Sequence, residues 1–315
     1  MTEKDHLLLV SQNIEDHLDE FNGRCEFHHY YNAEDKEALL QEVGEKIRVV
    51  GTNGHDGCSR EMMEKLPNLE MIGCYGVGYD AIDIDAAREK GIRVTNTPDV
   101  LSDAVAELTV GLMISLARQI PQSDRFVRDG KWTPLNGYPL TQELTGRTVG
   151  ILGLGRIGQE IANRLQAMKM RVIYHGRNCQ ADKPYVYYAE LEEMAKDSDW
   201  LVVIMPGGPG TQGIVSESVM RALGPNGNLV NVGRGPLVDE LALVRLLENG
   251  ELGGAALDVF AREPSVPEAL MGMDNVVLSP HAASATVKTR QAMGSLVIAN
   301  IMAHLNGMPL ITQVA

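Results

Sequence analysis

The chain has 315 residues and a clear excess of acidic side chains, with 42 Asp and Glu against 28 Lys and Arg and a formal net charge of −14. A hydrophobic fraction of 44% and a charged fraction of 22% are ordinary for globular proteins and argue against intrinsic disorder. A surface this negative repels polyanions, so we expect neither nucleic acid nor an anionic membrane as a partner. A small anionic ligand would need an arginine at its binding site to overcome this repulsion.

The cysteines and the apolar stretches bear on where the protein works. The four cysteines show no C-x-x-C spacing, and the amino-terminal segment is acidic without a long apolar stretch behind it. These features predict free thiols, no secretory signal and a cytoplasmic location. The longest strongly apolar stretch runs from Leu108 to Ala117, far short of the about 20 residues that a membrane helix needs.

Up to Pro98, short apolar runs alternate with helical patterns. Alternation of this kind predicts βαβ units, with a parallel sheet that carries helices on both faces. The residues predicted as strands are 7–10, 25–31, 47–52, 69–75 and 92–95. The residues predicted as helices are 14–21, 34–43, 60–66 and 84–90.

After Pro98 the pattern predicts a long helix from about Leu101 to Arg118 and an irregular loop over 130–145. A second alternating series then begins. Its predicted strands are 148–152, 171–174, 200–205, 228–232, 254–259 and 275–278. Its predicted helices are 157–168, 191–196, 216–223 and 239–248, and a last helix over about 285–305 closes the chain.

This order of elements predicts an α/β protein with two doubly wound parallel-sheet domains. The closing helix comes after the second series has used its strands, so we expect it to return to the first series. The predicted domains are therefore 1–98 plus 287–315, built from both chain ends, and 99–286. A chain of this length exceeds the about 250–300 residues at which single cores stop growing, which agrees with two domains.

The strongest local motif is the glycine loop at 148–158 (TVGILGLGRIG), which contains G-x-G-x-x-G. In a strand–loop–helix context, Gly153 allows the tight turn, Gly155 lets a pyrophosphate approach the backbone, and Gly158 lets helix and strand pack closely. The free amides of the helix N-terminus would bind the anion. The alternative is a structural turn in some other α/β protein.

The end of the next strand bears on the choice of dinucleotide. An NAD site usually has an acid about 20 residues beyond the loop, whereas an NADP site has an arginine nearby. Here the strand ends in His175-Gly-Arg177 without an acid. Arg177, with His175, would attract a 2′-phosphate, which makes NADPH the preferred cofactor and NADH the second candidate. The alternative for Arg177 is a solvated surface side chain.

Other segments complete a recognisable set, in the order 76–80 (GVGYD), 231–235 (NVGRG), 258–264 (DVFAREP) and 279–284 (SPHAAS). Together with the glycine loop, they resemble the D-isomer-specific 2-hydroxyacid dehydrogenases over nearly the whole chain. The resemblance implies a flavodoxin-like substrate domain and a Rossmann cofactor domain, with the active site in the cleft. It also implies homodimers, joined through the helix at 101–118 and the loop that follows it.

The resemblance places the catalytic arginine on Arg234, the acid on Glu263 and the histidine on His281. Reduction of a 2-oxo acid needs a hydride at C2 and a proton at the carbonyl oxygen. His281 would hold that proton, Glu263 would orient the ring and favour the imidazolium, and Arg234 would polarise the carbonyl. The chain contains no HExxH motif, so we expect no metal, and it lacks G-x-S-x-G and Walker A patterns.

The resemblance implies further contacts for the substrate and the cofactor. The substrate contacts are Val77, Gly78, Arg234, His281 and Ser284. Besides the three glycines, His175 and Arg177, the cofactor contacts are Arg156 and Ile157 at the pyrophosphate, Pro206 and Thr211 along the cleft, Val232 near the nicotinamide, and Asp258 on its carboxamide.

Within the family, Arg177 and the segment 130–132 (GKW) are most similar to NADPH-dependent glyoxylate/hydroxypyruvate reductases. The loop after Trp132 is short and carries no second tryptophan, so we expect 2-oxo acids larger than glyoxylate and hydroxypyruvate to be accepted as well. Two alternatives stay open at this point. One is an NAD enzyme similar to phosphoglycerate dehydrogenase, and the other is a non-enzymatic, dinucleotide-sensing corepressor on the same fold.

Overall fold

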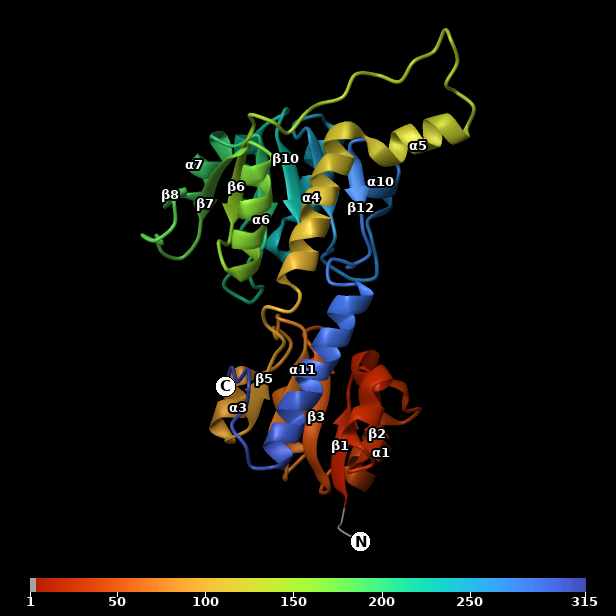
Figure 1. Ribbon diagram of the computed structural model, residues 1–315, viewed down its shortest axis with the longest axis vertical. Coiled ribbons are helices and arrows are strands. Elements are labelled where there is room, and N and C mark those ends of the chain that lie inside the picture. The colour runs from red at the N-terminus through yellow and green to blue at the C-terminus, as the bar shows by residue number, and fades with distance from the viewer. Residues whose placement is uncertain (1–3) are drawn as a thin grey trace. The chain divides into compact units, whose positions relative to one another are not determined.

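The computed structural model describes residues 4–315, which form two compact units (Figure 1). The first contains the described residues up to Leu101 together with 286–315, and the second contains residues 102–285. Each unit has its own parallel sheet. The fold is therefore of the α/β class, as the alternation of strands and helices predicts.

In the first unit the strand order is β2-β1-β3-β4-β5, and all neighbouring strands are parallel. This order is the flavodoxin-like one. The strands are β1 (Asp5–Leu9), β2 (Cys25–His29), β3 (Ile47–Asn53), β4 (Met71–Tyr75) and β5 (Arg93–Thr95). All five predicted strands are confirmed. The predicted second strand stops at His29, because the chain continues into a short 3-10 turn, η2 (Tyr30–Asn32).

The helices of the first unit are η1 (Gln12–Phe21), α1 (Lys36–Val43), α2 (Arg60–Glu64), α3 (Ile84–Glu89) and the closing helix α11 (Val287–Leu305). All of these except η1 begin at side chains that accept hydrogen bonds from the otherwise unpaired amides of the first turn. Asp35, Ser59, Asp83 and Thr286 accept such bonds at α1, α2, α3 and α11. The predicted helix at 14–21 forms as the 3-10 helix η1.

The closing helix α11 packs against β4, as expected for a segment that returns to the first unit. Gly73 makes the close approach possible, because a Cβ there would lie 3.2 Å from Ile301 Cδ1 and Val297 Cγ1. Both side chains are buried. The first unit is thus closed by residues from both ends of the described chain.

In the second unit the strand order is β12-β11-β10-β9-β6-β7-β8, again parallel throughout. Its first strand, β6 (Thr148–Leu152), lies between β7 and β9, which is the Rossmann order with its switch point between β6 and β9. The other strands are β7 (Arg171–His175), β8 (Val186–Tyr188), β9 (Trp200–Val203), β10 (Asn228–Asn231), β11 (Gly254–Leu257) and β12 (Val276–Leu278).

Both faces of this sheet are buried. Val149, Ile151 and Trp200 belong to one core cluster, and Leu152 and Leu201 belong to the other. The helices that cover the sheet are α4 (Ser102–Arg118), α6 (Arg156–Ala167), α7 (Leu191–Lys196), α8 (Glu217–Leu223) and α9 (Glu240–Glu248). Among the residues that the structure describes, no helix combines the length and apolarity needed to cross a membrane.

Four short elements of the second unit are not predicted from the sequence: β8, α5 (Ile120–Arg128), α10 (Glu268–Met271) and the 3-10 turn η3 (Gly235–Leu237). The strand β8 has three residues at the sheet edge and no fully buried side chain. The helix α5 has no buried residue and begins after Gln119, whose φ of 49° interrupts the long helix α4. The strand β8 is too short for an alternating pattern to stand out, and the few apolar residues of α5 stay outside the core, so neither segment has the buried apolar face that marks the other elements.

Candidate functional site

The glycine loop lies at the carboxyl end of β6, at the switch point of the second sheet. Gly153 has a φ of +104°, and a Cβ there would lie 2.6 Å from Ile204 O in the loop after β9. Backbone conformation and space therefore both require glycine. Open sheets of this kind bind ligands outside the carboxyl ends of their strands at the switch point.

The helix α6 begins directly after this loop. Its N-cap residue, Gly155, provides no side-chain cap, and a Cβ at Gly155 would meet no atom within 4 Å. A Cβ on Gly158 would clash with the carbonyl oxygen of Gly153, so this glycine permits the close contact of helix and loop. The arrangement leaves room for an anionic group over the first turn of α6, where Arg156 is exposed and Ile157 is half-buried.

The predicted ribose-binding residues follow β7, the strand next to β6. His175 donates from Nδ1 to the carbonyl oxygen of Tyr188 at 2.9 Å, because that oxygen can only accept. The ring of His175 is therefore held by the edge strand β8. Arg177 is exposed in the loop beyond.

Three further predicted cofactor residues, Pro206, Thr211 and Val232, occupy the loops after β9 and β10. The hydroxyl of Thr211 donates to Gly208 O at 3.1 Å, which closes a turn, and Pro206 is exposed in the same loop. Val232 is buried, with 5% of its surface exposed, at the end of β10. The side chain of Thr211 thus has a local structural partner.

The three predicted catalytic residues lie in loops after β10, β11 and β12, which are neighbours in the sheet. Arg234 follows β10, Glu263 follows β11 and His281 follows β12. The structure brings the acid and the histidine together, with 2.6 Å between Glu263 Oε2 and His281 Nδ1. Residues 18 positions apart in the sequence therefore form a direct ion pair or charged hydrogen bond.

Both carboxylate oxygens of Glu263 have a partner. Oε1 accepts from the amide of Phe260 at 3.1 Å, while Oε2 faces His281 Nδ1. The side chain of Glu263 is 21% exposed and that of His281 is 46% exposed. Because Nδ1 is occupied, the opposite ring nitrogen, Nε2, is the one directed away from Glu263.

The Arg234 loop is organised by Asn231 at the end of β10. Asn231 donates to the Arg234 carbonyl oxygen at 2.9 Å and accepts from the Gly233 amide at 3.1 Å. The guanidinium donates from one Nη to Gly233 O at 2.8 Å. Gly235 is required beside it, because a Cβ there would clash with the Phe260 backbone.

A function that the sequence motifs do not reveal belongs to Asp258, which is fully buried. Its carboxylate accepts from Ser279 Oγ at 2.5 Å, from Ala282 N at 2.8 Å and from Ala283 N at 3.0 Å. Its carbonyl oxygen accepts from the amide of His281 at 2.8 Å. Asp258 therefore holds the loop that carries His281 and the half-buried Ser284.

In the first unit, the predicted carboxylate-binding loop follows β4. Gly76 O accepts from the Thr97 amide at 2.9 Å, and Val77 O accepts from Asn96 Nδ2 at 2.9 Å. In a planar trans peptide the N–H points opposite to the C=O. The amides of Val77 and Gly78 therefore both point away from residues 96–97, on one side of the loop.

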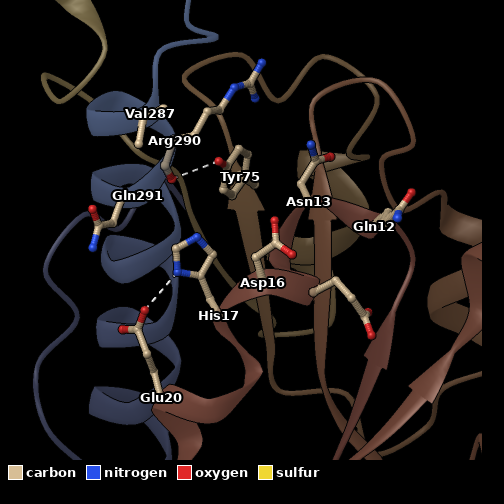
Figure 2. Close-up of a pocket in the computed structure, with 10 residues that line it drawn as sticks. Gln12, Asn13, Asp16, His17, Glu20, Tyr75, Val287, Arg290 and Gln291 are labelled. Carbon is tan, nitrogen blue, oxygen red and sulfur yellow. Dashed lines mark hydrogen bonds and ion pairs between the residues drawn. The ribbon is translucent and has the colours of Figure 1, made fainter.

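A polar pocket of about 660 Å³ lies beside this loop in the first unit (Figure 2). Figure 2 shows Val287, Arg290 and Gln291 on α11, with His17 and Asp16 beside the helix and Tyr75 above Asp16. Tyr75 donates to the carbonyl oxygen of Arg290 at 2.9 Å, and the Arg290 guanidinium lies 5.7 Å from its ring centre. No residue predicted for catalysis or binding lines this pocket.

Comparisons with known proteins agree with the motifs. Residues 110–283 match the family model for the NAD binding domain of D-isomer specific 2-hydroxyacid dehydrogenases. Glyoxylate/hydroxypyruvate reductase A of Arabidopsis thaliana is 46% identical over 295 residues, covering 94% of each chain. Hydroxyphenylpyruvate reductase of Plectranthus scutellarioides is 44% identical over 305 residues, covering 97% of this chain and 96% of its own.

Among solved structures, the NADPH-dependent glyoxylate/hydroxypyruvate reductase of Sinorhizobium meliloti, in complex with NADP and malonate, is similar with a TM-score of 0.90. It is 38% identical, and the match covers 99% of this chain and 97% of that one. On these matches, the chain belongs to the family of D-isomer-specific 2-hydroxyacid dehydrogenases.

Proposed function

We propose that this protein reduces 2-oxo acids to D-2-hydroxy acids with NADPH. The observation that carries the proposal is the contact between His281 and Glu263, which lie on neighbouring loops. Arg234 lies on the next loop, and the glycine loop follows a strand of the same sheet. Residues 99–286 then act as the cofactor domain, and residues 1–98 with 287–315 act as the substrate domain.

The residues at the switch point fit a dinucleotide. The space above Gly155, the uncapped N-terminus of α6 and the exposed Arg156 suit a pyrophosphate. When bound, the reduced nicotinamide supplies the hydride that adds to C2 of the substrate.

The chain's own residues then manage the proton and the developing charge. His281 Nε2 donates its proton to the carbonyl oxygen, and the ring is held by Glu263 at Nδ1. Arg234 stabilises the negative charge on that oxygen, since a guanidinium forms two parallel hydrogen bonds to planar oxygen pairs. One hydride and one proton convert the 2-oxo acid into the 2-hydroxy acid, and the cofactor leaves oxidised.

Two features support the finer assignments of cofactor and substrate. Arg177 lies exposed after β7, where a 2′-phosphate would bind, with His175 beside it. The outward amides of Val77 and Gly78 form a nest suited to the substrate carboxylate, with Ser284 as a further contact.

For the substrate side chain, we propose a range from glyoxylate and hydroxypyruvate to bulkier 2-oxo acids. Two relatives at 46% and 44% identity support this range, because one is named a glyoxylate/hydroxypyruvate reductase and the other a hydroxyphenylpyruvate reductase. Pro206, Thr211, Val232 and Asp258 complete the proposed cofactor site on the loops after β9, β10 and β11.

We also propose a cytoplasmic homodimer joined through α4, α5 and the loop up to residue 145. The helix α5 and the loop after it extend from the body of the second unit (Figure 1). Apolar side chains on this segment are exposed, and they are Ile120, Val127, Trp132, Leu135 and Leu140. Several large apolar side chains exposed on one segment are typical of a protein interface.

The deciding experiment is NADPH oxidation by the full-length protein with glyoxylate, hydroxypyruvate and hydroxyphenylpyruvate, each repeated with NADH. Turnover with at least one 2-oxo acid and a higher kcat/KM with NADPH are expected. Dinucleotide binding without turnover on any of the acids would refute the reductase and favour a dinucleotide-sensing role. A preference for NADH would contradict the assignment of Arg177.

A further inference from the structure

A cluster of potential metal-ligating side chains lies on β1 and β2 of the first unit and includes none of the residues proposed above for catalysis or binding. It consists of His6, Glu26 and His28. One potential ligand atom from each residue lies within 4.8 Å of the other two. The sequence motifs predict no metal here, because the three residues are brought together by the pairing of two strands and do not follow a linear spacing.

The strand register explains how the three side chains meet. In the parallel pair, His6 lies opposite Glu26 and Leu8 lies opposite His28. Side chains two residues apart share one face of a strand, so Glu26 and His28 project on the same side as His6. Leu8 on that face belongs to the core of the first unit.

The two imidazoles are already in contact. His6 Nδ1 lies 2.9 Å from His28 Nε2, and the two rings, nearly parallel with their centres 5.2 Å apart, meet edge to edge. Both histidines are half-buried and Glu26 is exposed. A hydrogen bond between the two nitrogens uses the proton of one ring and the lone pair of the other. Without that proton, both nitrogens have lone pairs that could bind one metal cation.

We propose that His6, Glu26 and His28 form a binding site for Zn²⁺ or a similar transition-metal dication. Two imidazole nitrogens and one carboxylate oxygen suit Zn²⁺, whereas Ca²⁺ and Mg²⁺ prefer oxygen ligands alone. The site is separated from β4 and its carboxylate-binding loop by β3 in the sheet. Its role is therefore structural, joining the edge strand β2 to β1, and it is independent of the proposed reductase activity.

The test is a Zn²⁺ titration of the full-length, untagged protein after treatment with a chelator, measured by calorimetry. We expect one Zn²⁺ per chain and a rise in Tm on binding. The substitutions His28→Gln and Glu26→Gln should each weaken binding by more than about tenfold. Glu26 is exposed, so its replacement does not disturb the core and the test does not depend on a fragile variant.

His29→Gln is the matched control. His29 is the next residue on β2, but it faces the other side of the sheet, where its Nδ1 lies 3.3 Å from Glu15 Oε2. Binding to this variant should equal that of the unmodified protein. The proposal is overturned if the unmodified protein binds no Zn²⁺, or if His28→Gln and Glu26→Gln bind it as tightly as His29→Gln does.

Discussion

The contact between Glu263 and His281 permits a sharp test of the proposed proton donor. Glu263 accepts two hydrogen bonds, one from Phe260 N at 3.1 Å and one from His281 Nδ1 at 2.6 Å. A glutamine at this position has one acceptor oxygen and one donor NH₂ group. In Glu263→Gln, one of the two donors must therefore face an NH₂ group, and the negative charge next to the imidazole is lost.

The expected loss follows from the kind of bond removed. A hydrogen bond to a charged group contributes about 1.5–3 kcal/mol. At about 1.4 kcal/mol per factor of ten, kcat for 2-oxo acid reduction should fall about ten- to hundred-fold. The KM for the 2-oxo acid should change little, because Glu263 acts on the histidine and not on the substrate.

The assay is steady-state NADPH oxidation with the best 2-oxo acid of the panel, together with Tm as a measure of folding. Glu240→Gln is the matched control, since Glu240 Oε1 accepts from the amide of Ala261 at 3.0 Å. Glu240→Gln removes a neighbouring carboxylate that bonds to the backbone, and its kcat should equal that of the unmodified protein. If Glu263→Gln also keeps its kcat, or if both variants lose it equally, the proposed role of the pair is wrong.

Three other outcomes can be measured directly. Arg177→Ala should raise the KM for NADPH about tenfold in the same assay and leave the KM for NADH unchanged, because the proposed partner of Arg177 is the 2′-phosphate, which NADH lacks. Equal effects on both cofactors would contradict this. When the folded protein is treated with an alkylating reagent and analysed by mass spectrometry, the exposed Cys179 should be modified first. Burial raises the pKa of Cys58 to about 12, and the remaining cysteines are also buried. Labelling of Cys58 before Cys179 would contradict the burial of Cys58 in the core of the first unit. Burial, reinforced by Arg93, lowers the pKa of His304, so the neutral ring is favoured in the folded state. This stabilisation is present above pH about 6.5 and is lost as the pH falls toward the lower folded-state pKa. Urea unfolding of His304→Gln should show a weaker loss of stability below that pH than the unmodified protein, and an identical loss would exclude His304 as the cause.

Much of the fold is predictable because the parallel strands are buried on both faces. Val149, Ile151 and Leu201 are examples of side chains in continuous apolar runs, and such runs stand out in the sequence. The strand β8 and the helix α5 contain no fully buried side chains, so they leave no comparable pattern. What can be read from a sequence is therefore mainly what is buried and regular.

The candidate site is likewise predictable only in part. The glycines and the proposed catalytic residues lie in motifs at strand ends, and the family resemblance locates them by number. Contacts between distant residues have no linear pattern, so neither the bonds from Asp258 to the His281 loop nor the contact of His6 with His28 can be foreseen. The first depends on the neighbouring positions of β11 and β12, and the second depends on the register of β1 and β2.

The backbone of His281 shows why the buried aspartate matters for the chemistry. His281 has a φ of 51°, a left-handed conformation that costs a non-glycine residue about 1–2 kcal/mol. Asp258 accepts hydrogen bonds from the amides of His281, Ala282 and Ala283, which offset this cost and keep the loop in place. Strain of this kind persists at functional sites where the surroundings over-determine the conformation. Asp258 thus sets the backbone that presents the imidazole, and Glu263 sets the rotation of the ring. Because the two acids act on different degrees of freedom, neither can replace the other in positioning Nε2.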